Sequence, residues 1–324
     1  MLGKTGFEVS EVSLGTWQLG GRWGSGFDQK KALATVHAAI DHGINFIDTA
    51  DVYSDGLSEK AVALAVKTRK ERVYVATKCG RRLNPHIAEG YNEKNIRRFV
   101  EDSLRNTGFP VLDLIQLHCP PSEIYDDERV FEILERLRDQ GKIIHYGVSV
   151  EKVDEALKAI EYPGVATVQI IFNMFRLKPA ERFFPEAVKK NVGILARVPL
   201  ASGLLTGKLT RSSVFGPADH RTFNRNGEAF DKGETFSGMD YTKGLEAVEK
   251  LRQLFPGSPE LTPWALKWTL MFGAVSCVIP GASTPEQAVQ NAAVADLPPL
   301  SDEQMQGVGE IYNRFIREDA HHLW

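Results

Sequence analysis

Four residues with reactive side chains lie close to the ends of short apolar runs in the first half of the chain. In chain order they are Asp48, Tyr53, Lys78 and His118. Asp48, Lys78 and His118 each follow directly on an apolar run that is typical of a buried strand, and Tyr53 lies in the stretch just after Asp48. A strand interior does not hold an unpaired charge, so these positions indicate a site at strand ends.

These side-chain types fit proton delivery to a carbonyl oxygen. A tyrosine with an ordinary pKa of about 10 is a weak acid at neutral pH, and a cationic Lys78 beside the Tyr53 hydroxyl is expected to lower that pKa. Asp48 would hold the ammonium in place, and His118 would orient the carbonyl. We therefore predict that Tyr53 protonates an alkoxide forming under hydride attack, an acid catalysis worth about 10²–10⁴-fold. One histidine and one aspartate make a poor zinc site, so no metal is predicted.

Eight apolar runs that alternate with helix-like segments must position this site. The predicted strands are Val12–Trp17, Asn45–Asp48, Val73–Thr77, Leu112–Leu117, Ile143–Val148, Val165–Ile171, Val192–Val198 and Val275–Ile279. Strict alternation implies parallel strands joined by right-handed crossovers, and eight such units close a (β/α)8 TIM barrel whose active site lies at the carboxyl ends of the strands. A doubly wound sheet is the rival fold, but the glycines at 20, 21, 24 and 26 lack the spacing of its phosphate-binding turn.

The helix-like segments carry apolar residues at helical spacing and have recognisable ends. We predict helices at Asp28–His42, Ser58–Lys67, Asn95–Thr107, Val130–Leu137, Val153–Ile160, Phe184–Lys190, Pro263–Phe272 and Pro285–Ala293. Ser58 is the expected cap of the second helix.

Two segments exceed what a barrel needs. The stretch from Ala201 to Tyr241 reads as a long polar, glycine-rich loop after strand seven, followed by an extra amphipathic helix at Lys243–Phe255. The tail from Ser301 begins with a C-terminal helix. Its last residues, with His321 and His322, are expected to be a frayed end, with a lid over the pocket as the alternative. We expect residues 1–324 to form a single barrel domain.

Composition excludes several classes of protein. The 324 residues are 43% hydrophobic and 25% charged with a net charge of −3, which is ordinary for a globular chain and argues against nucleic-acid binding. No run approaches the roughly 20 apolar residues of a membrane span. The N-terminus lacks the apolar segment of a secretory signal, and the three distant cysteines suit a reducing compartment, so a cytoplasmic protein is expected.

Several motifs follow one another along the chain. They are Phe46-Ile47-Asp48-Thr49-Ala50-x-x-Tyr53, Ala76-Thr77-Lys78, Asp113-Leu114-Ile115-Gln116-Leu117-His118, Gly147-Val148-Ser149, residues 199–208 (Pro-Leu-Ala-Ser-Gly-Leu-Leu-Thr-Gly-Lys) and Ile279-Pro280-Gly281-Ala282-Ser283. In this order they resemble the aldo-keto reductase superfamily. The last two forms are similar to the bacterial general oxidoreductase and potassium-channel β-subunit-like branch. The resemblance implies a (β/α)8 barrel, an NAD(P)(H) cofactor, a small-molecule carbonyl substrate, and a catalytic tetrad of Asp48, Tyr53, Lys78 and His118.

The resemblance also assigns residues to the cofactor and the substrate. The implied cofactor-binding residues are Gly15, Thr16, Trp17, Asp48, Ser149, Gln169, Arg197, Pro199, Leu200, Ser202, Gly203, Leu204, Lys208, Gly281, Ser283, Gln287 and Asn291. Among these, Ser149 and Gln169 would hydrogen-bond the nicotinamide carboxamide. The implied substrate pocket is lined by Trp17, Trp23, Tyr53, His118 and Phe172.

The chain departs from the family pattern at the nicotinamide and at the adenosine end. Arg197 stands where an aromatic residue often stacks on the nicotinamide, and Val150 where an asparagine often follows the serine. The adenosine motif lacks the usual cation for a 2′-phosphate, although Arg221, Arg225 or Lys208 could supply one. The expected cofactor is NADP(H), with NAD(H) as the alternative.

Two other functions use the same residues. A cofactor-binding regulatory subunit that senses redox state would bind nicotinamide tightly and turn over very slowly. A barrel aldolase would use Lys78 as a Schiff base, but a neighbouring Asp48 that keeps the amine charged disfavours a nucleophilic lysine.

Overall fold

The computed structural model describes residues 1–21, 26–258 and 260–324, and its centre is an eight-stranded parallel sheet. The strands pair in chain order as β1 (Leu14–Gly15), β2 (Phe46–Asp48), β3 (Tyr74–Cys79), β4 (Leu112–His118), β5 (Ile143–Val150), β6 (Val165–Ile171), β7 (Gly193–Arg197) and β8 (Val275–Ile279). Parallel bridges from Val12 to Val278 and from Gly15 to Gly281 bring the last strand back to the first. The predicted (β/α)8 barrel is therefore confirmed.

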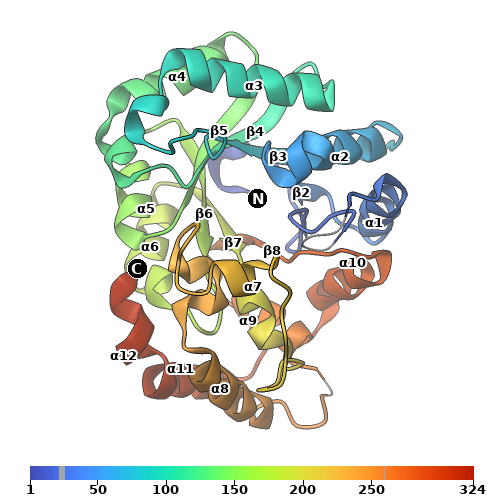
Figure 1. Cartoon of the computed structure of the whole chain (residues 1–324), viewed down its shortest axis with the longest axis vertical. Helices are drawn as coiled ribbons and strands as arrows, with labels where there is room; N and C mark the ends of the chain where they lie inside the picture. The colour runs from blue at the N-terminus through green and yellow to red at the C-terminus, as the bar shows by residue number, and fades with distance from the viewer. Residues whose placement is uncertain (22–25, 259) are drawn as a thin grey trace.

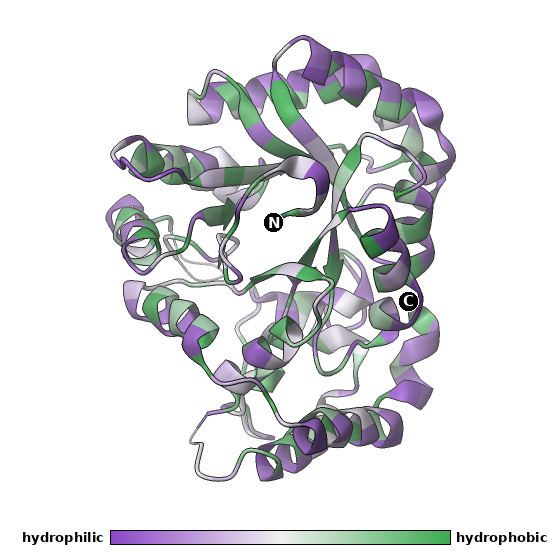
Figure 2. Cartoon of the chain, turned by 180° about the vertical axis from the view of Figure 1, so that it is seen from behind, coloured by the Kyte–Doolittle hydropathy of each residue, from purple (hydrophilic) through white to green (hydrophobic). Residues whose placement is uncertain are grey.

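Helices surround the strands on the outside (Figure 1). They are α1 (Gln29–Asp41), α2 (Leu57–Lys67), α3 (Glu93–Thr107), α4 (Glu128–Asp139), α5 (Val153–Ala159), α6 (Lys178–Lys189), α9 (Thr262–Leu270) and α10 (Pro285–Ala292). The outward faces of these helices are largely hydrophilic, whereas the strands are largely hydrophobic (Figure 2). None of the helices in the described ranges has the length and apolar content that a bilayer crossing requires.

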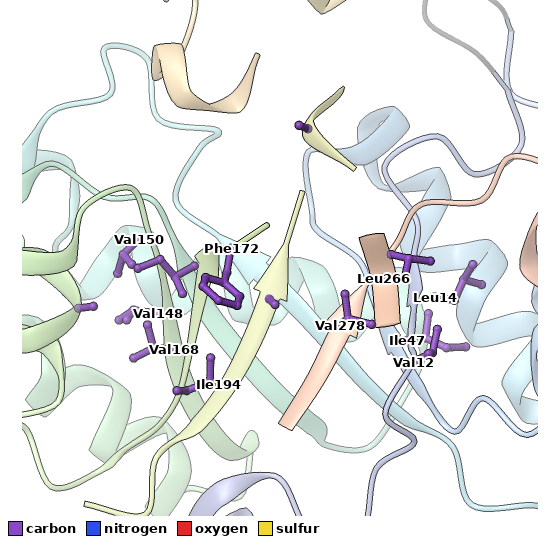
Figure 3. Packing of buried hydrophobic residues seen from close by; sticks show 14 of the residues in the cluster. Val12, Leu14, Ile47, Val148, Val150, Val168, Phe172, Ile194, Leu266 and Val278 are labelled. Carbon is purple, nitrogen blue, oxygen red and sulfur yellow. The ribbon is translucent and has the colours of Figure 1, made fainter. Parts of the chain in front are cut away.

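Two hydrophobic clusters, a larger one and a smaller one, stabilise the barrel. The larger lies between strands and helices, where Val148, Val168 and Ile194 from consecutive strands pack beside Phe172 (Figure 3). The smaller cluster includes Phe46, Ala76, Leu114, Leu195, Cys277 and Ile279 from the strands, and Leu2 and Phe7 from the N-terminal segment. Apolar residues therefore fill one part of the barrel, and the polar strand ends are left for a site.

Most predicted elements match the observed ones, and the differences have local causes. β6 and β8 have the predicted bounds, whereas β1 is shorter than predicted and its last paired residue is Gly15; the Thr16 amide and hydroxyl both donate to the Asp48 carbonyl oxygen at the end of this pairing. α6 begins at Lys178 instead of Phe184, because Pro179 suits a first helical turn, where no amide donor is needed. The Ser58 cap was wrong: Gly56 is the N-cap, with a φ of 82° that favours glycine.

The segment between β7 and β8 is more ordered than its composition predicted. It contains the short helices η5 (Ala201–Thr206), α7 (His220–Phe223), η6 (Lys232–Glu234) and η7 (Phe236–Gly238), followed by the extra helix α8 (Tyr241–Gln253). His220, Glu234 and Phe236 are buried, and the Asn224 side chain accepts hydrogen bonds from the amides of residues 229 and 230. This segment therefore packs as part of the barrel mouth.

The C-terminal tail also packs, so the expectation of a frayed end was wrong. Helices α11 (Asp302–Phe315) and α12 (Arg317–Ala320) lead to a buried Trp324. The Trp324 ring lies 3.8 Å from the guanidinium of the buried Arg176. A Cβ added at Gly233 or Gly238 would lie 2.8 or 2.5 Å from the same ring, so the tail also covers the loop.

Candidate active site

The four residues of the predicted tetrad converge at the carboxyl ends of β2, β3 and β4. Asp48 and His118 are the last residues of β2 and β4, Lys78 is next to last in β3, and Tyr53 opens η2 (Tyr53–Gly56). Asp48, Lys78 and His118 are buried, and Tyr53 is half-buried. The strand ends bring these side chains together although 70 residues separate the first from the last.

The Lys78 ammonium donates to three acceptors. Its Nζ lies 2.5 Å from Asp48 Oδ1, 3.0 Å from the Thr49 carbonyl oxygen and 3.3 Å from the Tyr53 hydroxyl oxygen. An ammonium has three donors and no acceptor, so the Tyr53 oxygen must accept the third hydrogen bond. The Tyr53 hydroxyl hydrogen is then left to point toward a ligand.

The pKa of Tyr53 is shifted in the direction opposite to our expectation. Burial raises it above its ordinary value, and the nearby Lys78 ammonium only offsets part of this effect. Burial alone would lower the pKa of Lys78, but Asp48 and Tyr53 favour the charged form, and the net shift is upward. The free protein therefore holds a protonated phenol beside a charged amine, the protonation states that a general acid needs.

His118 is held as a neutral imidazole. Burial lowers its pKa well below the ordinary value, and the positive charges of Arg81, Lys78 and Arg197 lower it further. Its ring lies edge-on to the Tyr53 ring with centroids 5.9 Å apart. Within the described ranges, the buried Nδ1 has no hydrogen-bond partner. A neutral imidazole here can donate one hydrogen bond to a carbonyl oxygen without supplying a charge.

Aromatic residues from distant parts of the chain stand next to Tyr53. Trp17 lies 6.5 Å from Tyr53, 5.0 Å from His220 and 6.3 Å from Phe230, measured between ring centroids. His220 and Phe230 belong to the long loop and were not predicted. The sequence shows only that these two ring side chains occur within a polar loop. It does not show that they lie next to Trp17, because that contact depends on the fold.

One predicted pocket residue, Phe172, lies away from Tyr53, and a second, Trp23, cannot be compared. Phe172 is fully buried in the outer core, where it stacks on Trp268 at 5.2 Å and contacts the rings of Phe184 and Phe272. Its aromatic side chain serves packing between β6 and the helices, so we withdraw it from the pocket. Trp23 lies outside the described residues.

The residues predicted to hold the nicotinamide are neighbours across two strands. Ser149 of β5 and Gln169 of β6 are register partners, and both are buried. The Gln169 Nε2 donates to Asp48 Oδ2 at 2.8 Å. A Cβ added at Gly15, at the end of β1, would lie only 3.0 and 3.1 Å from its nearest neighbouring atoms, so a larger residue would be in close contact there.

The residues predicted to hold the phosphates lie within η5 or directly beside it in the chain, and several already have partners. The Ser202 hydroxyl donates to the Glu234 carbonyl oxygen at 2.9 Å, and Lys208 forms an exposed ion pair with Glu260. A tight turn begins at Pro199 and Leu200 and continues through Gly203 and Leu204. In this turn the Leu200 carbonyl oxygen accepts a hydrogen bond from the Gly203 amide. Their assignment to the cofactor stays a prediction.

At the adenosine end the predicted residues brace one another. The Ser283 amide and hydroxyl both donate to Gln287 Oε1, at 2.8 and 3.1 Å. Asn291 Nδ2 donates to the Gly281 carbonyl oxygen at 3.3 Å, which fixes the turn before α10. A Cβ at Gly281 would find nothing closer than 4.0 Å, so the backbone here is open on one side.

Arg197 belongs to a group of four ionisable side chains, two of them buried and two half-buried, that the sequence did not reveal. This charge cluster consists of Arg81, Glu151, Arg197 and Glu234. Arg197 Nη2 lies 2.8 Å from Glu151 Oε2 and its Nη1 lies 3.4 Å from Glu234 Oε1, while Arg81 Nη2 lies 3.1 and 2.6 Å from the same two carboxyl groups. The charge cluster joins β7, the residues just after β3 and β5, and the long loop.

The two acids of the charge cluster differ in their protonation. Burial raises the pKa of Glu151 to about 8 despite the nearby Arg197. Burial would also raise the pKa of Glu234, but Arg81 and Arg197 hold it below its ordinary value. Cys119, Glu151 and Glu234 bring ligand-type atoms within 4.8 Å of one another, yet the two guanidiniums occupy the carboxylates, and we propose no metal there.

Comparison with known proteins agrees with this architecture. The Aldo/keto reductase family matches residues 11–313, so the chain belongs to that family. It is 30% identical over 314 residues to the oxidoreductase YqkF of Bacillus subtilis (95% of this chain, 94% of the relative). It is 28% identical to a probable voltage-gated potassium channel subunit beta of Arabidopsis thaliana (92% and 91%). The structure of glycerol dehydrogenase AKR11B4 from Gluconobacter oxydans superposes with a TM-score of 0.77 at 31% identity, covering 96% and 94% of the two chains.

We predict that Arg197→Met lowers the free energy of unfolding by about 3–5 kcal/mol, because it removes a guanidinium from the buried Glu234 carboxylate and a hydrogen-bond donor from the Glu151 carboxyl group. The free energy of unfolding is measured by chemical denaturation at neutral pH. The matched control is Arg211→Met, which removes an exposed pair with Glu246 and should cost at most about 1 kcal/mol. An equal decrease in the free energy of unfolding in the two variants would show that the charge cluster stabilises the protein no more than an exposed ion pair does.

Proposed function

We propose that this protein reduces an aldehyde or ketone to an alcohol with NAD(P)H, and that Tyr53 is the general acid. Membership of the family supports an oxidoreductase acting on carbonyl groups in general. The observation that carries the finer assignment is the Lys78 ammonium, whose third donor is taken by the Tyr53 oxygen. Among the described residues, this geometry gives Tyr53 a hydroxyl hydrogen free to leave and a cation to stabilise the phenolate.

The donor set of the site fits a nicotinamide dinucleotide. A carboxamide needs both a donor and an acceptor, and the paired Ser149 hydroxyl and Gln169 amide offer both. The open turn at Gly281 precedes the N-terminus of α10, where the helix dipole favours a phosphate. When bound, the cofactor supplies the hydride.

The residues of the tetrad then divide the remaining work. His118, neutral and buried, and the Tyr53 hydroxyl would both donate to the carbonyl oxygen and fix its position. As negative charge develops on that oxygen, Tyr53 transfers its proton to it, and the alcohol forms. Lys78 stabilises the resulting phenolate, and Asp48 keeps Lys78 in place. Solvent returns the proton to Tyr53.

A small-molecule carbonyl compound is the proposed substrate, bound against the aromatic wall of Trp17, His220 and Phe230. The similarity to a channel β subunit supports a second candidate, a regulatory subunit with little turnover. The two candidates differ in the rate of hydride transfer to a panel of aldehydes and ketones, measured in a single turnover. Rapid transfer to any of them excludes the regulatory role as the sole function.

We expect Tyr53→Phe to lower kcat by about 10²–10⁴-fold, because the variant has no proton to give. Cofactor affinity, measured by fluorescence titration, should stay nearly unchanged. Tyr162→Phe removes a hydroxyl that donates to the Tyr125 carbonyl oxygen and serves as the control with near-normal turnover. Retention of turnover by Tyr53→Phe would refute the general acid.

The pH dependence of kcat/KM should show no ionisation near 6.5. His118 has a pKa well below its ordinary value of 6.5, so it stays neutral as pH rises from mildly acidic to alkaline. Tyr53 must be protonated to act, and its pKa is raised above 10.0, so activity is lost only above that pH. A decline of kcat/KM at neutral pH would contradict these assignments.

We propose NADP(H) as the preferred cofactor, with NAD(H) as the alternative. Arg221 supports this preference because its guanidinium, paired with Asp219, has its Nη1 3.5 Å from the Ser202 carbonyl oxygen, which places a cation beside η5. We expect NADPH to bind at least about tenfold more tightly than NADH, since a hydrogen bond between a charged donor and a phosphate contributes roughly 1.5–3 kcal/mol. Side-by-side fluorescence titrations test this, and equal affinities would overturn the preference.

A further inference from the structure

A hydrogen bond across the barrel joins the proposed cofactor site to the acid group. Gln169 lies in β6 and Asp48 in β2, four strands away in an eight-stranded ring. The Gln169 Nε2 lies 2.8 Å from Asp48 Oδ2, and both side chains are buried. The opposite amide orientation would set a carbonyl oxygen against a carboxylate, so the nitrogen must face Asp48.

The two oxygens of Asp48 have separate partners. Oδ1 accepts from Lys78 at 2.5 Å and Oδ2 accepts from Gln169 at 2.8 Å. A carboxylate held at both oxygens cannot rotate about its Cβ–Cγ bond without breaking one contact. Gln169 therefore determines where Oδ1 points, and Oδ1 in turn determines where the Lys78 ammonium lies relative to the Tyr53 hydroxyl.

We propose that Gln169 is a positioning residue for the proton donor: through Asp48 and Lys78 it sets the acidity and placement of the Tyr53 hydroxyl. This proposal rests on the function proposed above and adds to it. Within residues 1–21, 26–258 and 260–324, the Gln169 side chain bonds only to Asp48, so its second amide hydrogen and its Oε1 can contact a nicotinamide carboxamide while the side chain orients Asp48. Cofactor binding and proton donation are thereby coupled through a single amide.

The barrel itself offers a matched control. Gln116 is also a fully buried glutamine on a strand, and it is the register partner of Lys78 in β4. Within the described ranges, neither polar atom of its side chain has a hydrogen-bond partner. A change at Gln116 thus alters the packing of the barrel without removing a contact to Asp48.

The test compares Gln169→Met, Gln169→Glu and Gln116→Met with the wild-type protein. Three quantities are measured: kcat at saturating cofactor as a function of pH, the dissociation constant of the cofactor, and the ionisation of residue 53. The last is followed by ¹⁹F NMR in protein labelled with 3-fluorotyrosine, whose phenol ionises at lower pH than tyrosine. The Tyr53→Phe variant assigns the resonance.

We expect Gln169→Met to lower kcat about 10- to 100-fold, the loss of a hydrogen bond to a charged group. The ionisation of residue 53 should move to higher pH, because a displaced Asp48 no longer holds Lys78 against the phenol. In Gln169→Glu, kcat should recover as pH falls, since only the protonated carboxyl can donate to Asp48. Gln116→Met should change neither kcat nor the ionisation of residue 53.

Two results would overturn the proposal. One is a Gln169→Met variant that weakens cofactor binding but leaves kcat at saturation and the ionisation of residue 53 unchanged, which would limit Gln169 to a cofactor contact. The other is an equal effect of Gln116→Met, which would assign the effect to packing. If Gln169→Met does not fold, the pH dependence of kcat in Gln169→Glu tests the proposal: a kcat that does not recover as pH falls would overturn it. The ¹⁹F titration needs no turnover, so it tests the positioning role even if the wild-type protein reduces no carbonyl compound.

Discussion

The buried ion pair between Lys78 and Asp48 is the interaction on which the site depends. Neither charge could be buried alone, because the desolvation of an isolated ion costs several kcal/mol. The pair is tolerated because the Lys78 Nζ has three acceptors within 3.3 Å and the Asp48 carboxylate has a donor at each oxygen. Those partners come from β2, η2, β3 and β6, so only the closed barrel provides all of them.

A second set of ionisable residues lies around His118 and differs in its role from the pair of Lys78 and Asp48. Arg81, Glu151, Arg197 and Glu234 pair with one another and join the strand ends to the long loop. Burial keeps the His118 imidazole neutral, and the positive members of this group, together with Lys78, lower its pKa further. Trp324 covers the same loop from outside through Gly233 and Gly238. The barrel mouth is therefore fixed by electrostatic pairing inside and by aromatic packing outside.

The sequence predicted the barrel because its signals are local and repeated. Each strand is an apolar run of a few residues, each helix has apolar residues at helical spacing, and strict alternation leaves few topologies. The strand-end positions of Asp48, Lys78 and His118 followed from the same pattern. The early start of α6 was missed although Pro179 is a local signal for a first helical turn. The errors at Ser58 and at the tail arose where a tertiary contact outweighed a local preference: Ser58 is buried against Thr16, and Trp324 packs on Arg176.

The sequence by itself determined the order of the elements, the family and the residues at the strand ends, because these depend on periodicity and on motifs contiguous in the chain. Only the tertiary structure decided that Gln169 reaches Asp48, that Arg197 pairs with Glu151 and Glu234, that Phe172 packs in the outer core, and that burial raises the pKa of Tyr53. Each of these depends on the distance between residues remote in the chain or on the removal of water. Neither quantity is encoded in the spacing of residue types.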